Sequence, residues 1–147
     1  MKFVKAAVIG ALLTAGAAFA EGDRTDPNAI ARSALMKVIG KNTGILGDMA
    51  GGKAPHDAAA AEGAKAALIE AAAKIEETFK EQGAADPASE AKPEIWANWD
   101  EFLADAKALG DAAGAMDVAS AETIGAGMGA LGGACKDCHT DFRVMKQ

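Results

Sequence analysis

Aromatic side chains are scarce in this chain of 147 residues: they make up 5% of it, and tyrosine is absent. Runs rich in Ala, Lys and Glu with few β-branched residues argue against a β-sandwich or barrel. Two cysteines are too few for a disulfide-stapled fold. Because half of the residues are hydrophobic, intrinsic disorder is excluded as well. A single, mostly helical domain remains.

Long hydrophobic runs are also missing, since no uncharged stretch reaches the ~20 residues that a membrane-spanning helix needs. The run that comes closest covers residues 6–18 and follows the basic residues Lys2 and Lys5. The sequence Ala18-Phe19-Ala20 then fits a small-x-small cleavage site. We therefore expect residues 1–20 to be a secretory signal peptide and residues 21–147 to be the mature domain.

Basic residues are fewer than acidic ones in the expected mature domain. Without Lys2 and Lys5, the mature domain keeps 13 of the 15 basic residues beside 21 acidic ones, a formal charge of −8. Such a domain is repelled by nucleic acids and by anionic lipid. The charge favours a partner with a basic docking surface, although simple solubility explains it equally well.

Four amphipathic segments occupy most of the mature domain, with apolar residues recurring every three or four positions. They are expected at residues 27–50, 57–82, 93–116 and 120–145. In the first segment the expected buried stripe is Ala31, Leu35, Val38, Asn42, Ile45 and Met49; in the last it is Ile124, Met128, Leu131, Cys135, Cys138, Phe142 and Met145. Short connections predict an all-α, antiparallel up-down-up-down four-helix bundle.

The strongest motif lies near the C-terminus, where Cys135-Lys136-Asp137-Cys138-His139 has the form C-x-x-C-H. Residues i and i+3 share one face of a helix, so both thiols can form thioethers with the two vinyl groups of one haem. His139 then supplies an imidazole to the iron as the proximal ligand. The motif predicts one covalently bound haem c.

Two rival interpretations of the cysteine pair are weaker. A thioredoxin-like redox pair needs a βαβ context, which the helical pattern does not provide. A structural zinc site needs four Cys or His ligands, and His56 is the only other histidine.

The bundle topology itself suggests a second iron ligand. In an up-down-up-down bundle the start of the first helix lies level with the end of the last, so Met36 and His139 lie at matching depth. The other candidates do not fit this position. Met49, His56 and Met116 fall at the opposite end of the bundle, whereas Met128 and Met145 lie on the same helix as His139. Met36 is thus either the distal ligand or a core packing residue.

The same depth argument predicts the residues around the haem: Ile75, Phe79, Ile95, Trp96, Trp99 and Phe142. Arg32, one turn before Met36, is interpreted either as a haem propionate partner or as a solvated surface arginine. Arg143, one turn after His139, is a weaker candidate for a role near the proximal ligand. Five glycines between residues 125 and 133 weaken the last helix, which then needs support from packing or from a bound group.

Several segments together resemble the class II cytochromes c, the cytochrome c prime family, over essentially the whole mature domain. They are residues 32–37, 40–42, 52–59, 92–96, 133–139 and 141–143. The resemblance implies a four-helix bundle with the haem near the C-terminus, and homodimers are common in the family. The loop before the third helix is shorter here than the family pattern.

The resemblance implies one of two haem types. High-spin members have five-coordinate iron with an apolar distal residue and bind NO or CO. Low-spin members place a methionine sulfur from the first helix on the iron, and Met36 matches that position, four residues after Arg32. The turn after the first helix and the residues around Met36 look more like the low-spin type.

We therefore expect a bacterial periplasmic electron-transfer protein with His139 and Met36 on the iron. The alternative is a five-coordinate cytochrome that binds NO or CO. An enzyme such as a peroxidase is not expected, because no distal His and Arg pair is found to act on peroxide.

Overall fold

The computed structural model describes residues 23–145, so the expected signal peptide lies outside the described residues. The helices in chain order are α1 (Pro27–Ala50), α2 (Ala58–Ala73), α3 (Ile75–Phe79), α4 (Glu94–Ala97), α5 (Trp99–Ala115) and α6 (Ala121–Phe142). None of these helices is long and apolar enough to cross a membrane.

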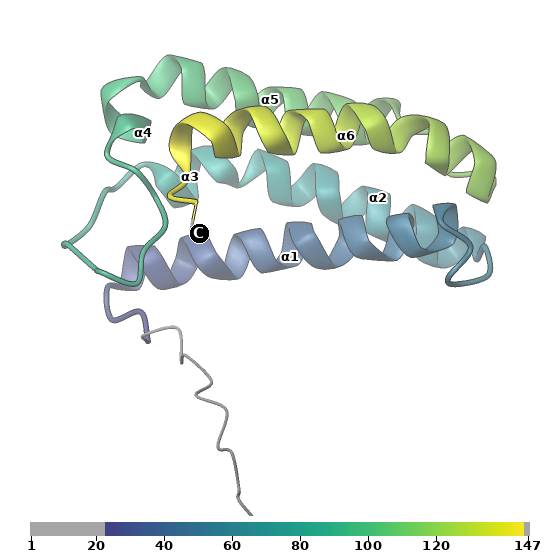
Figure 1. Ribbon diagram of the computed structural model, residues 1–147, viewed down its shortest axis with the longest axis horizontal. Coiled ribbons are helices and arrows are strands. Elements are labelled where there is room, and N and C mark those ends of the chain that lie inside the picture. Colours follow the sequence, from purple (N-terminus) through teal and green to yellow (C-terminus); the bar gives the residue numbers. More distant parts are fainter. Residues whose placement is uncertain (1–22, 146–147) are drawn as a thin grey trace, which may run out of the picture.

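The four long helices form a ring in which each packs against two neighbours (Figure 1). Helix α1 contacts α2 and α6, and α5 contacts the same two helices from the other side. Successive long helices run in opposite directions, with α3 continuing α2 and α4 preceding α5. The predicted antiparallel four-helix bundle is confirmed.

Side-chain caps begin three of the long helices, close to the starts expected for the first, second and fourth segments. Asp26 accepts a hydrogen bond from the backbone N–H of Ala29, and Pro27 follows it in the first turn. Asp57 caps α2 in the same way, and Ser120 forms a capping box with Thr123. These caps satisfy N–H groups that have no partner within the helix.

Two predicted helices are interrupted. The second ends at Phe79 rather than near Gln82 and is broken at Lys74, whose backbone N–H bonds to Ala71 in a tightened turn. The third is broken at Asn98, which has φ −124° and ψ 50°. These breaks place α3 and α4 as short separate helices at one end of the bundle (Figure 1).

The buried stripe of α1 is displaced from the expected one. Val38 is 45% exposed, whereas Ile39 and Leu46 are 5% and 0% exposed. The expected stripe included Asn42 and left out Arg32. In the structure Arg32 is buried, whereas Asn42 is only half-buried. The expectation for Met145 is also wrong, because α6 ends at Phe142 and Met145 is 66% exposed.

Candidate functional site

The register between α1 and α6 is defined by two close approaches far from the C-x-x-C-H motif. A β-carbon at Gly47 would lie 3.5 Å from Met128 Cε, and one at Gly125 would lie 3.9 Å from Ala50 Cβ. Counting eleven residues back from Gly47 reaches Met36, and counting eleven forward from Met128 reaches His139. Because the helices are antiparallel and rise equally per residue, these two residues lie level along the bundle.

The two cysteines lie on one face of α6, half-buried against the hydrophobic core and not joined in a disulfide. Burial raises the pKa of both thiols, and for Cys138 burial and the charge of Asp105 raise it to about 12. Both thiols are therefore neutral at pH 7. Redox-active and metal-binding cysteines need the opposite shift, so the burial of this pair argues against thiolate chemistry.

His139 follows the second cysteine and is also half-buried. Burial, followed by the nearby charge of Arg143, lowers the pKa of its imidazole. Within the described part of the chain, neither ring nitrogen has a hydrogen-bond partner. A neutral imidazole with a free nitrogen is the form that binds a metal.

Met36 is half-buried on α1 beside Leu35, and both pack against the core. Met49 and Met116 are buried at the opposite end of the bundle, and Met128 lies against Gly47. Within the described residues, Met36 is therefore the methionine on a different helix that lies level with His139.

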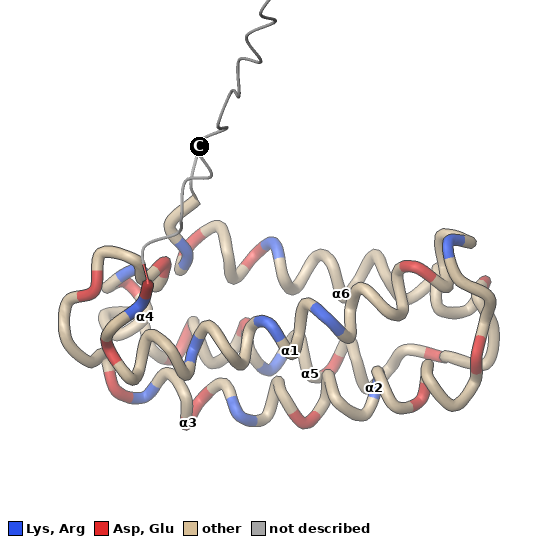
Figure 2. Tube along the Cα trace, turned by 90° about the horizontal axis from the view of Figure 1, so that it is seen from below, with Lys and Arg blue, Asp and Glu red and all other residues tan. Residues whose placement is uncertain are grey.

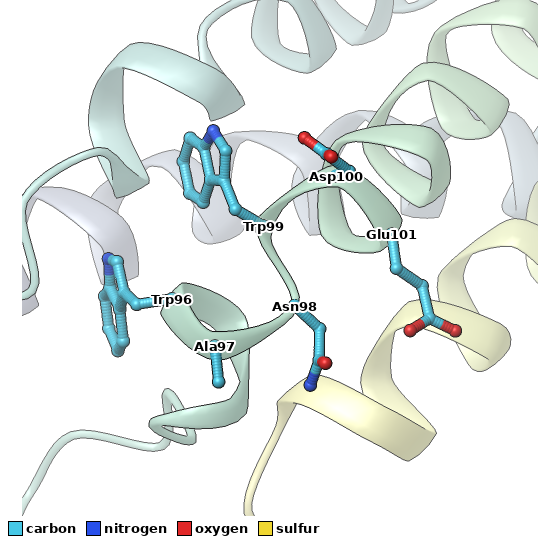
Figure 3. A pocket seen from close by; sticks show the side chains of 6 residues that line it. All are labelled: Trp96, Ala97, Asn98, Trp99, Asp100 and Glu101. Carbon is cyan, nitrogen blue, oxygen red and sulfur yellow. The ribbon is translucent and has the colours of Figure 1, made fainter.

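An aromatic cluster fills the core at this end. The ring of Phe102 lies 5.1 Å from Phe79, 5.5 Å from Trp99 and 5.4 Å from Phe142 between centroids. The indole nitrogen of Trp96 donates a hydrogen bond of 2.8 Å to the carbonyl of Phe79. Figure 3 shows a shallow pocket at the break between α4 and α5, where both indoles lie on one side and Asn98 and Glu101 extend toward α6.

Arg32 is 5% exposed, so its interpretation as a solvated surface arginine is wrong. Its guanidinium lies 5.2 Å from the ring centroid of Trp96 and 5.8 Å from that of Phe79. Nη1 donates hydrogen bonds to the carbonyls of Glu81 and Gln82, at 3.0 and 3.2 Å. Nε is buried without any partner, which leaves one donor for an anionic group.

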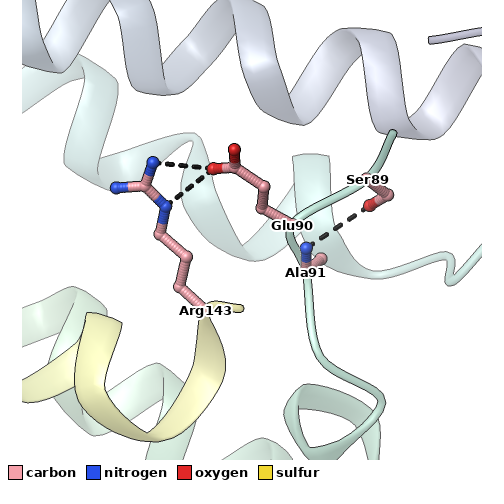
Figure 4. A network of polar contacts seen from close by, with 4 residues as sticks. All are labelled: Ser89, Glu90, Ala91 and Arg143. Carbon is pink, nitrogen blue, oxygen red and sulfur yellow. Dashed lines mark hydrogen bonds and ion pairs between the residues drawn. The ribbon is translucent and has the colours of Figure 1, made fainter. Parts of the chain in front are cut away.

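Sequence reasoning missed the polar residues of the loop between α3 and α4. Glu90 pairs with Arg143 through both Nε and Nη2, at 2.8 and 2.7 Å (Figure 4). Asp86 accepts hydrogen bonds from the backbone N–H groups of Thr25 and Asp26. A loop carboxylate leaves no periodic signal in a sequence, so neither contact was foreseeable.

The residues at this end fit a haem. The neutral thiols of Cys135 and Cys138 and the neutral imidazole of His139 lie on α6. The sulfur-containing side chain of Met36 belongs to a residue that lies level with His139 on the neighbouring helix α1. Half-buried apolar side chains at the same end pack against the core, including Trp96 and Trp99. In the described part of the chain, no group of His, Cys, Asp and Glu is arranged to hold a metal ion by itself.

Comparisons with known proteins identify the family of this chain. The family model described as cytochrome c' matches residues 28–143. Cytochrome c-556 of Agrobacterium tumefaciens (strain apple 185) is 38% identical over 119 residues, which are 79% of this chain and 94% of the relative. Cytochrome c' of Pararhodospirillum photometricum is 37% identical over 121 residues, 76% of this chain and 92% of the relative.

Among solved structures, cytochrome c' from Rhodobacter sphaeroides superimposes with a TM-score of 0.74 at 30% identity. The match covers 81% of this chain and 96% of that one. The family match spans all four long helices and the C-x-x-C-H motif. The chain therefore belongs to the cytochrome c' family, a family of monohaem proteins, and carries the two cysteines that the covalent attachment of haem c requires.

Proposed function

We propose that this protein is an electron carrier whose haem iron is held by His139 and Met36 and is low-spin. The observation that supports this most is the register of α1 and α6, which sets the two residues level with each other on neighbouring helices. Cys135 and Cys138 hold the haem edge covalently. The low-spin type is also consistent with relatives named cytochrome c-556.

When bound, the haem supplies an iron that takes up and gives back one electron. The protein's own residues determine how much rearrangement and how much contact with water accompany this electron transfer. His139 and Met36 would hold the iron in both oxidation states, so little rearrangement would accompany electron transfer. The aromatic cluster around Phe102 excludes water, and the unpartnered Nε of Arg32 is the donor that we assign to a haem propionate.

The test is the optical and EPR spectrum of the purified holoprotein beside Met36→Ala. We expect a low-spin wild type that becomes high-spin in the variant, because alanine offers no ligand. Met128→Ala is the matched control, since it removes a half-buried methionine that lies eleven residues from His139 on the same helix. A wild type that is already high-spin contradicts the assignment of Met36.

The second candidate function is NO or CO binding at a five-coordinate iron. The packing of Met36 against the core favours it, because a packed methionine without an iron bond leaves the sixth position open. Relatives named cytochrome c' are as similar to this chain as those named c-556. Rapid binding of CO to the ferrous protein would favour this function.

We propose an acidic docking face for a basic redox partner. The charges of Glu101, Asp137 and Asp141, added to burial, raise the pKa of Asp105, so these four carboxylates lie close together on α5 and α6. Elsewhere acidic and basic positions are mixed along the helices (Figure 2). The rate of electron transfer to a basic partner is expected to fall as salt is added.

Three further points are proposals of the same kind. Residues 1–20 direct export to the periplasm, which N-terminal sequencing of the mature protein tests. Homodimer formation is tested by sedimentation of the holoprotein. We propose no enzymatic role, since in the described chain His56, the other histidine, contacts Val118 in the turn before α6.

A further inference from the structure

We propose that residues 80–93 act as a strap that holds α1 against the haem, and that Glu90 is the residue that positions this strap through Arg143. The inference rests on the proposed function for the place of the haem. It gives a role to a loop that contains neither the C-x-x-C-H motif nor the proposed iron ligands.

One end of the strap is fixed to the end of α6. Glu90 accepts two hydrogen bonds from Arg143, and Ala91 pairs with Arg143 in an antiparallel bridge. The backbone N–H of Lys92 bonds to the carbonyl of Phe142 at 3.0 Å. Lys92 Nζ donates to the carbonyls of Thr140 and Asp141, both at 3.0 Å. These last carbonyls of a helix have no partner within it.

The other end is fixed to the start of α1. Arg32 holds the carbonyls of Glu81 and Gln82, and the backbone N–H of Ala84 donates to Asp26 at 3.0 Å. Gly83 has φ +76°, and a β-carbon there would collide with Asp26 and Asn28. The strap thus lies directly on the first turn of α1.

The two attachments lie one turn outside the proposed iron ligands. Arg32 precedes Met36 by four residues, and Arg143 follows His139 by four. At the far end of the bundle, direct contact between Gly47 and Met128 sets the distance between α1 and α6. At the haem end a flat group has to fit between the helices, so a tie across the outside replaces that contact.

The experiment measures the rate of CO binding to the ferrous holoprotein. In Glu90→Ala we expect a rate increase of about tenfold, equivalent to about 1.4 kcal/mol, because α1 moves away from the haem more often. Glu90→Gln keeps an oxygen that accepts from Arg143, so it is expected to restore part of the wild-type rate. Asp86→Ala, which removes two of the hydrogen bonds between the strap and the start of α1, is expected to act in the same direction.

Hydrogen exchange gives a readout that does not depend on ligand chemistry. Backbone amides of residues 32–36 are expected to exchange faster in Glu90→Ala than in the wild type. Ser120→Ala is the control, because it removes a cap from the far end of the same helix α6. It is expected to lower the melting temperature without changing the CO rate.

The strap and the proposed function fail in different ways. Unchanged CO rates and unchanged exchange in both Glu90→Ala and Asp86→Ala overturn the strap, whatever the spin state. A high-spin wild type overturns the assignment of Met36 alone. In that case faster CO binding in Glu90→Ala still supports the strap, since α1 covers that side of the haem with or without a sulfur–iron bond.

Discussion

Both ends of the bundle have a buried core, but the end that carries the C-x-x-C-H motif also has a set of half-buried side chains that includes both cysteines and both tryptophans. At the end formed by the turns 51–57 and 116–120, Leu46, Ile124 and Met116 are 0 to 2% exposed. At the other end Met36, the two cysteines and both tryptophans are only half-buried, although they pack against the same core. At the motif end the buried aromatic cluster around Phe102 thus lies beside a half-buried set of side chains, where we expect the haem to bind.

Polar contacts also differ between the ends, in number rather than in range. At the end formed by the turns 51–57 and 116–120, here called the closed end, His56 contacts the carbonyl of Val118 and Lys65 donates to that of Met116, across 62 and 51 residues. At the end that carries the motif, such contacts between distant segments are more numerous and include Arg143 to Glu90 and Asp86 to Thr25. At the motif end these contacts lie outside the core and join the loop 80–93 to both α1 and α6.

The largest expected effect comes from removing the haem from the end of the bundle that carries the C-x-x-C-H motif. Cys135→Ser combined with Cys138→Ser prevents covalent attachment, and we expect α6 to fray and lose helicity. Five glycines in residues 125–133 each cost ~1 kcal/mol relative to alanine, and the haem no longer compensates. Far-ultraviolet circular dichroism tests this; full helicity with a sharp thermal transition would contradict it.

The next prediction compares one core residue from each end. Phe102→Ala removes the ring in contact with Phe79, Trp99 and Phe142 and is expected to cost about 3–5 kcal/mol. Leu46→Ala, at the closed end, is expected to cost about 2–5 kcal/mol. Only the first should shift the haem absorption bands. A spectral shift in Leu46→Ala would show that the two ends are not independent.

The features that the sequence predicts are those that depend on neighbouring residues, whereas contacts between distant segments are not predictable from it. The bundle and the starts of its helices close to Asp26, Asp57 and Ser120 were predictable, because each depends on residues close in sequence. The stripe of α1 was not, because Arg32 replaces an apolar residue in the core. A buried arginine is stabilised by carbonyls and rings that come from distant segments.

The candidate site divides similarly. The C-x-x-C-H motif and the matching depth of Met36 were readable from local spacing and helix counting. The contacts of Glu90 and Asp86 were not, since they depend on how a loop without periodicity folds over two helix ends. A sequence identifies residues that share a helix more readily than residues that join two.

The third prediction concerns acid. Backbone N–H groups of Ala29 and Ala84 lower the pKa of Asp26 below its ordinary value. Its stabilising effect is present above the unfolded-state pKa of about 3.9 and is lost as the pH falls through the lower folded-state value. Asp26→Asn should therefore be less stable than the wild type at pH 7 and approach it at pH 2–3. An equal difference at both pH values would rule out this contribution.

The smallest expected effect tests whether the closed end matters to the haem at all. Ser120→Ala removes the side chain that caps α6 and costs about 1 kcal/mol, which lowers the melting temperature by about 4 °C. Because α6 also carries the cysteines, a helix that frays from its start would be expected to disturb them. Ile124 and Leu131, both 0% exposed, lie between the cap and the motif and should stop the fraying. We therefore expect an unchanged haem spectrum, and a changed one would mean that α6 transmits strain along its glycine-rich length.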